Sequence, residues 1–180
     1  MDRRHFVMAL PVLPALAAAG CSTPGLKLDA PYVSTPQQVV DEMLKLAQVG
    51  PTDVVYDLGC GDGRFVINAA SRYGARGVGI DLDPLRIAQA REGALREGVA
   101  DRVSFRQEDL FKADFSAATV VTLFLFTELN ARLAPRLRAE LKPGARIVAY
   151  EYGIPGWPHQ DQAQMQIDGQ VHRMMLWRIG

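Results

Sequence analysis

Between residues 35 and 150, two kinds of hydrophobic pattern alternate along the chain. Short runs rich in β-branched residues predict buried strands, and longer segments with apolar residues every three or four positions predict amphipathic helices. Strands that alternate with helices form a parallel sheet with helices on both faces. The predicted strands are 53–58, 77–81, 103–106, 118–124 and 146–150, and the predicted helices are 35–47, 64–73, 83–97 and 127–141.

The last part of the chain departs from this alternation. Two strand-like runs, 165–167 and 171–179, flank Asp168-Gly169. An Asp-Gly pair between two strands favours the tight turn of a β-hairpin. We therefore predict an α/β fold with a Rossmann-like, doubly wound, mostly parallel seven-stranded sheet that ends in an antiparallel hairpin.

The first twenty residues do not fit the domain pattern. Arg3-Arg4 precede an apolar stretch, 7–19, that is too short to span a bilayer but has the length of a secretory signal. The arginine pair resembles a twin-arginine export signal, and 16–21 resembles a lipoprotein cleavage box in which Cys21 receives the lipid. We predict a signal-like segment at 1–20, a linker at 21–30 and a domain at 31–180. The alternative is an N-terminus without export function, on a cytoplasmic or membrane-tethered protein.

Charge and cysteine content exclude several classes of function. The chain has 20 basic and 20 acidic residues, and removal of 1–20 leaves 18 against 19. A general nucleic-acid binder needs a basic excess, so no nucleic-acid partner is expected. Two cysteines and three scattered histidines predict neither disulfides nor a metal site. We expect a monomer, with a solvated face at Arg132, Arg136, Arg138 and Lys142.

A glycine-rich turn follows the first predicted strand and reads Asp57-Leu58-Gly59-Cys60-Gly61-Asp62-Gly63. A dinucleotide site would have its third glycine at position 64, which is Arg64, and the Gly-Lys-Ser/Thr of a phosphate loop is absent. The closer glycine spacing after an acidic residue suits a cofactor with a cationic amino group and no pyrophosphate. Asp57, Gly59, Gly61 and Gly63 are therefore candidate cofactor residues; a purely structural turn is the alternative.

Two further carboxylates stand at predicted strand ends, where open α/β sheets bind ligands. Asp81 ends the second strand and can accept hydrogen bonds from both hydroxyls of a ribose, while Asp83 is placed to cap the next helix. Asp109 follows the third strand and is chosen over Glu108 to receive an adenine amino group. The alternatives are a helix-capping role for Asp81 and a solvated acidic turn at Asp109.

With these motifs, residues 31–180 resemble the class I S-adenosylmethionine-dependent methyltransferases. They are more narrowly similar to the small lysine methyltransferases that act on the ATP synthase c-subunit and the adenine nucleotide translocase. The narrower likeness is carried by 31–36, 56–65, 118–125, 130–137 and 141–144. It implies S-adenosylmethionine as cofactor and a protein lysine as acceptor. The chain departs from that family at Ser34 and Thr127, where prolines are usual, and at Tyr150-Glu151, where a His-Asp-like pair is usual.

For the methyl acceptor we expect a partly apolar pocket, because desolvation lowers the pKa of a lysine amine. Tyr32, Thr35, Phe124, Tyr150 and Trp157 are the candidates to wall it. The alternative for each of these side chains is ordinary packing in the core or in a loop. Alternatives to a protein-lysine methyltransferase are a module that binds S-adenosylmethionine without transferring methyl, and a small-molecule methyltransferase.

The N-terminal segment yields a test of location. We expect the wild type to be cleaved before Cys21 and lipid-anchored on the periplasmic side of a membrane. An Arg3→Lys, Arg4→Lys double variant should remain uncleaved in the cytoplasm, because the twin-arginine signal is lost. Cell fractionation and mass spectrometry of Cys21 measure both outcomes. A wild type that stays wholly cytoplasmic and unlipidated would contradict the export prediction.

Overall fold

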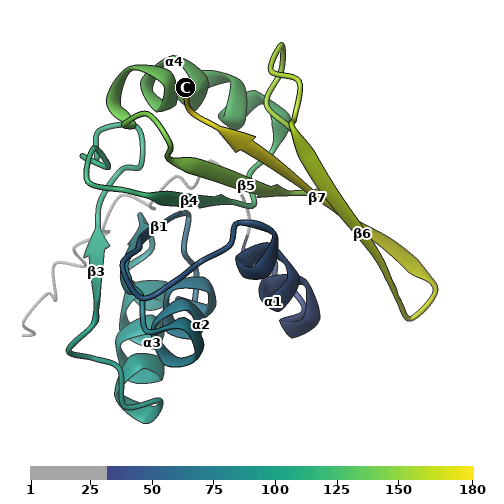
Figure 1. The fold of residues 1–180 in the computed structure, drawn as a ribbon. Coiled ribbons are helices and arrows are strands. Elements are labelled where there is room, and N and C mark those ends of the chain that lie inside the picture. Colours follow the sequence, from purple (N-terminus) through teal and green to yellow (C-terminus); the bar gives the residue numbers. More distant parts are fainter. Residues whose placement is uncertain (1–31) are drawn as a thin grey trace, which may run out of the picture.

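The computed structural model describes residues 32–180, so the signal-like segment, the linker and Cys21 lie outside the described residues. The elements follow the expected order: helices and strands alternate from α1 to β3, β4 follows β3 without a helix between them, and β5, β6 and β7 follow α4 (Figure 1). The elements are α1 (Gln37–Leu46), β1 (Val54–Leu58), α2 (Arg64–Tyr73), β2 (Arg76–Asp81), α3 (Pro84–Arg96), β3 (Val103–Gln107), β4 (Val120–Leu123), α4 (Thr127–Glu140), β5 (Arg146–Tyr150), β6 (Asp161–Ile167) and β7 (Gln170–Arg178).

All seven strands form one sheet in the order β3-β2-β1-β4-β5-β7-β6. Strands β1 to β5 pair in parallel, and β7 is antiparallel to both β5 and β6. The predicted mostly parallel sheet with a terminal hairpin is therefore confirmed. The chain reverses its direction of winding between β1 and β4, which lie side by side at the centre of the sheet.

Each face of the sheet buries its own hydrophobic core, because successive strand side chains point to opposite faces. Val55 of β1 packs with α1, α2 and α3 on one face. Its neighbour Tyr56 packs with α4 and the segment 110–118 on the other. Figure 1 shows α1, α2 and α3 below the sheet and α4 above it. No helix within residues 32–180 is long and apolar enough to cross a membrane.

Three local predictions need correction. Thr35 does not cap α1: Pro36 stands at the N-cap without a side-chain hydrogen bond, and Thr35 is buried. Strand β4 begins later than predicted because Ala118 closes a turn, in which its N–H donates to the carbonyl of Phe115. Strand β6 begins at Asp161, earlier than predicted, because backbone pairing with β7 continues through a polar stretch.

Arg132, Arg138 and Lys142 are exposed, as a solvated face requires, but the arginines of α4 also contact aromatic rings. Guanidinium groups of Arg132, Arg136 and Arg138 lie over aromatic rings, at 3.7, 4.7 and 4.5 Å from the ring centroids. Arg136 is half-buried and also donates to the carbonyl of Ala113 at 2.7 Å. These side chains hold α4 against the adjoining segments, a contribution that the charge pattern alone did not predict.

At the amino-terminal ends of the parallel strands, the carboxylate of Asp53 connects three segments of the chain. Asp53 pairs with Arg146 at the start of β5, and both side chains are largely buried. Asp53 also accepts hydrogen bonds from the Thr119 hydroxyl at 2.6 Å and from the Gly50 N–H at 2.8 Å. The starts of β1, β4 and β5 are thereby fixed together.

We expect Asp53→Ala to lower the free energy of unfolding by about 3 kcal/mol, because it leaves the buried Arg146 charge unpaired. Urea unfolding of the full-length protein measures the change. Asp101→Ala is the matched control, since Asp101 is exposed and the same truncation there should cost less than about 0.5 kcal/mol. Equal losses in the two variants would contradict a structural role for the pair.

Candidate functional site

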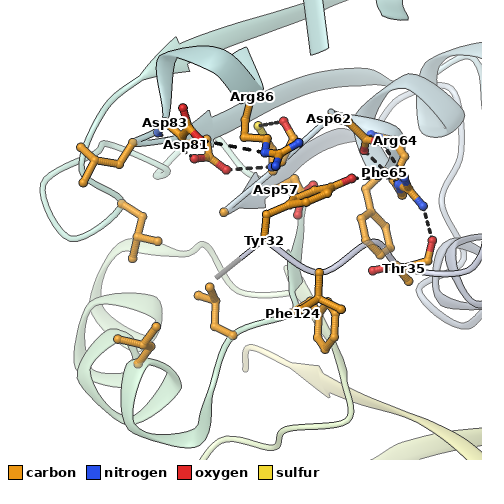
Figure 2. A pocket seen from close by; sticks show the side chains of 18 of the residues that line it. Tyr32, Thr35, Asp57, Asp62, Arg64, Phe65, Asp81, Asp83, Arg86 and Phe124 are labelled. Carbon is orange, nitrogen blue, oxygen red and sulfur yellow. Dashed lines mark hydrogen bonds and ion pairs between the residues drawn. The ribbon is translucent and has the colours of Figure 1, made fainter. Parts of the chain in front are cut away.

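A cavity of about 250 Å³ opens at the carboxyl ends of β1 to β4, where the direction of winding reverses. The segment just before α1 covers it from one side (Figure 2). Its lining combines carboxylates, two arginines and aromatic rings. The lining residues are Tyr32, Val33, Thr35, Asp57, Gly59, Cys60, Gly61, Asp62, Arg64, Phe65, Asp81, Leu82, Asp83, Arg86, Glu108, Asp109, Leu110, Phe124, Leu125, Phe126, Leu129 and Tyr152.

The glycine-rich turn folds back onto the end of β2. The N–H groups of Gly59 and Cys60 both donate to the carbonyl of Ile80, and the Gly61 N–H donates to Asp81 Oδ2 at 2.8 Å. Gly61 has φ +53°, and a Cβ there would lie 2.5 Å from the ring of Tyr32. The absence of a side chain at Gly61 therefore lets Tyr32 lie directly on the turn.

Tyr32 is held in this place by two arginines. The guanidinium of Arg86 lies over its ring at 3.8 Å from the centroid, and Arg64 donates to its hydroxyl at 3.3 Å. Arg64 also pairs with Asp62 and donates to the carbonyl of Thr35. The segment before α1 is thus tied to α2 and α3, and Figure 2 shows Tyr32 between the two arginines.

Gly63 does not line the cavity. It precedes α2 with φ +80°, and a Cβ there would lie 2.6 Å from the ring of Phe105 and 2.9 Å from Ala90. The structure accounts for this glycine by the close packing of the turn against α3 and β3. Gly59 and Gly61, in contrast, both line the cavity.

The two aspartates after β2 have separate roles. Asp83 caps α3, because its Oδ1 accepts the Leu85 N–H at 2.8 Å. Asp81 accepts the Asp83 N–H on Oδ1 at 2.9 Å and the Gly61 N–H on Oδ2. The helix-capping alternative for Asp81 is therefore wrong. Each of its oxygens keeps a second lone pair for a ligand, and Asp81 lines the cavity.

Asp109 lines the cavity but also stabilises its own turn. Its Oδ1 accepts the N–H of Phe111 at 2.9 Å, and Oδ2 lies 3.8 Å from the ammonium of Lys112. Glu108 lines the cavity as well. Both carboxylates thus flank the space beyond β3, and the choice of Asp109 over Glu108 stays a prediction.

Asp57 lies at the floor of the cavity and is buried at the centre of the sheet. Thr122 of β4 donates to its Oδ1 at 2.7 Å. Burial raises the pKa of Asp57 from 3.8 to about 7, although the hydrogen bond from Thr122 lowers it. The negative charges of Asp81 and Asp62 also raise this pKa, and the positive charge of Arg64 lowers it. Burial and the Asp57 charge also raise the pKa of the Cys60 thiol well above its ordinary value, so Cys60 stays protonated and is no nucleophile.

Aromatic rings form the end of the cavity beyond β4 and β5. Phe124 and Tyr152 lie with ring centroids 6.3 Å apart, and Phe126 meets Tyr152 edge-on at 5.4 Å. Phe126 is 38% exposed, as is Tyr32, so both rings are also accessible from outside. Of the predicted acceptor-pocket residues, the structure places Tyr32, Thr35 and Phe124 in the cavity lining.

Tyr150 and Trp157 do not line the cavity. Tyr150 is buried behind Phe124, with ring centroids 4.4 Å apart, and its hydroxyl shares a hydrogen bond with His172 Nδ1 at 2.5 Å. Trp157 lies under Arg138, and its carbonyl accepts the indole N–H of Trp177 at 3.0 Å. For these two residues the packing alternative describes the structure.

Sequence reasoning missed the arginines that hold Tyr32. Arg64 stood in the glycine-rich motif and was used only to exclude a dinucleotide site, and Arg86 carried no motif at all. Helical spacing from the cap at Asp83 places Arg86 on the turn facing the cavity, which is the one signal available in the sequence.

Within residues 32–180, no group of three or more metal-ligating side chains is arranged to hold a metal ion.

The buried Asp57 carboxyl generates a prediction on pH dependence. Its folded pKa lies above the unfolded value, so the stability that it contributes is present at low pH and is lost as pH rises toward about 7. Asp57→Asn removes this loss and keeps an acceptor for Thr122. Relative to wild type, the variant should gain roughly 3 kcal/mol between pH 5 and pH 8, measured by urea unfolding. An equal difference at both pH values would contradict the raised pKa.

Comparisons with known proteins agree with this geometry. The family model of the ANTKMT methyltransferase domain matches residues 57–161. A protein-lysine N-methyltransferase of Saccharolobus islandicus (strain REY15A) is 42% identical over 151 residues, which are 83% of this chain and 94% of that protein. The adenine nucleotide translocase lysine N-methyltransferase of Mus musculus is 36% identical over 133 residues, 73% of this chain and 57% of that protein. The chain thus spans somewhat more than half the length of the mouse relative.

Solved structures of methyltransferases also resemble this chain. The crystal structure of an RNA methyltransferase from Salinibacter ruber with S-adenosyl-L-homocysteine has a TM-score of 0.76 and 48% identity, and the match covers 82% of this chain and 94% of that chain. An S-adenosylmethionine-dependent methyltransferase from Thiobacillus denitrificans, also with S-adenosyl-L-homocysteine, has a TM-score of 0.59 and 26% identity over 64% of this chain and 48% of that chain. S-adenosylmethionine, the cofactor that the resemblance implied, is confirmed, and the chain belongs to the ANTKMT methyltransferase domain family of S-adenosylmethionine-dependent methyltransferases.

Proposed function

We propose that the protein transfers a methyl group from S-adenosylmethionine to the side-chain amine of a lysine in a protein. The observation that carries the proposal is the composition of the cavity beside β1 and β4. Carboxylates from the ends of β1, β2 and β3 line one part of it, and aromatic rings from the segments after β4 and β5 line the other. A cationic cofactor and an amine acceptor each find matching chemistry there.

The cofactor is assigned to the carboxylate part of the cavity. Gly59 and Gly61 line this part, and the free lone pairs of Asp81 suit the two ribose hydroxyls. Asp109 is assigned to the adenine amino group. When bound, S-adenosylmethionine supplies a methyl group on a sulfonium, which is already an activated electrophile. The protein then needs to orient the acceptor and exclude water, and it needs no covalent intermediate.

The charge of the cavity favours a cationic acceptor over a nucleic acid. Its lining contains six carboxylates (Asp57, Asp62, Asp81, Asp83, Glu108 and Asp109) and two guanidinium groups (Arg64 and Arg86). Both arginines are already engaged, with Asp62 and with the ring of Tyr32. Phosphate groups of an RNA would meet an acidic surface at this opening, whereas a lysine would be attracted to it.

The aromatic part of the cavity suits the acceptor amine. An ammonium has no lone pair, so the lysine must lose its proton before it attacks the methyl group. Phe124, Phe126 and Tyr152 can surround the alkyl stem and desolvate the amine, which lowers its pKa in the required direction. The same rings can attract the cationic form on approach.

The assignment of Asp81 is tested by Asp81→Ala. We expect the variant to bind S-adenosyl-L-homocysteine about 1.5–3 kcal/mol more weakly in calorimetry, the range for hydrogen bonds to a charged group. Asp83→Ala is the matched control: it removes the α3 cap but no ribose contact, so its affinity should change much less. A folded Asp81→Ala protein with the wild-type dissociation constant would remove Asp81 from the cofactor site.

The acceptor is tested with radiolabelled S-adenosylmethionine and an extract of the cells in which the protein is made. We expect label in protein that survives acid hydrolysis as methyl-lysine. Phe126→Ala should reduce this label about tenfold or more, by removing one wall of the acceptor pocket, without changing affinity for S-adenosyl-L-homocysteine. Leu95→Ala, which truncates an exposed apolar side chain on α3, is the control. Label found only in RNA or in small molecules would contradict the lysine proposal.

A further inference from the structure

Asn130 of α4 connects two separate segments of the chain through its side chain. The residue is fully buried, and its Nδ2 donates to the carbonyls of Leu125 at 3.1 Å, Tyr152 at 2.9 Å and Gly153 at 3.3 Å. Two hydrogens serve three acceptors, so one of the hydrogens is shared. One side-chain amide thus joins the segment after β4 to the segment after β5.

The orientation of this amide follows from its surroundings. With the amide reversed, Oδ1 would face three carbonyl oxygens and all four acceptors would lack a donor. In the orientation observed, Oδ1 has no hydrogen-bond partner among residues 32–180. A buried acceptor without a donor is unfavourable, so packing alone does not explain an asparagine here. The three hydrogen bonds from Nδ2 to backbone carbonyls explain why an asparagine stands at this position.

The two segments joined by Asn130 carry the aromatic end of the cavity. Phe124 and Phe126 flank Leu125, and Tyr152 is itself one of the residues bound. The backbone pairing of β4 and β5 stops at Leu123 and Ala149, before either segment begins. Beyond the sheet, the side chain of Asn130 therefore supplies the hydrogen bonds that bridge them.

We propose that Asn130 is a positioning residue for the methyl acceptor, which holds the two segments so that Phe126 and Tyr152 remain 5.4 Å apart at the acceptor end. The inference rests on the proposed function, in which these rings surround the alkyl stem of the acceptor lysine. Asn130 does not line the cavity itself. The carboxylate part of the cavity belongs to β1, β2 and β3, so loss of the bridge should impair acceptor binding and leave cofactor binding intact.

The test uses full-length wild type, Asn130→Ala and Asn130→Asp, in which the carboxylate would face three carbonyl oxygens. Asn68→Ala is the matched control, because Asn68 is half-buried and its Nδ2 also donates to a carbonyl, that of Arg64 at 2.7 Å, but on α2. Three quantities are measured: the Kd for S-adenosyl-L-homocysteine, the KM for poly-L-lysine, and backbone hydrogen exchange in 124–126 and 152–154. Hydrogen exchange reports the bridge without any substrate.

For Asn130→Ala we expect a KM for poly-L-lysine raised about tenfold, the factor equivalent to roughly one net hydrogen bond. Exchange in both segments should accelerate, while the Kd for S-adenosyl-L-homocysteine stays within about twofold of wild type, a change well below that of one hydrogen bond. Asn130→Asp should show the same pattern at least as strongly, and Asn68→Ala should show none of it. If Asn130→Ala does not fold, Asn130→Ser keeps one donor and should give intermediate values.

Unchanged exchange in both segments would overturn the proposal, as would an unchanged KM or a Kd that rises in parallel with KM. Failure of the proposed function looks different: the wild type itself would then methylate no lysine substrate. In that case exchange still decides whether Asn130 bridges the segments, and the acceptor role is overturned together with the lysine proposal.

Discussion

The reversal of winding between β1 and β4 is the constraint on which the site depends. The chain leaves β1 for α2 on one face of the sheet and leaves β4 for α4 on the other. Because the two connections diverge, the carboxyl ends of the central strands remain uncovered by either helix. The cavity occupies this opening, and the segment before α1 closes one side of it.

The cavity has two chemically different parts because different strands supply them. Asp57, Asp81 and Asp109 follow β1, β2 and β3, and the rings of Phe124 and Tyr152 follow β4 and β5. A buried carboxylate such as Asp57 costs free energy because burial removes it from water, which is why its pKa is raised. In the proposed function, the aromatic wall excludes water from the place where the acceptor amine loses its proton. Adjacent parts of one cavity would then meet the opposite requirements of cofactor and acceptor.

Several side chains shape the site by holding other site residues in place. Asn130 joins the two aromatic segments through its side-chain amide, and the guanidinium of Arg86 lies over the ring of Tyr32. Asp83 caps α3 and donates its own N–H to Asp81, which fixes the direction of that carboxylate. Precise placement of site residues therefore depends on a surrounding layer of backbone hydrogen bonds.

Much of this architecture is determined by the sequence itself. Hydrophobic period distinguishes strands from helices, and Asp168-Gly169 specifies the hairpin because both residues adopt the positive φ that the turn requires. The glycine-rich turn and Asp81 could be located because their chemistry is local, within one strand-helix-strand unit. Only the tertiary structure decided that Gly63 serves packing, that Tyr150 and Trp157 lie behind the cavity, and that Arg86 and Asn130 support it. Those roles arise from contacts between segments far apart in the chain, and periodicity and spacing carry no information on which distant side chains meet.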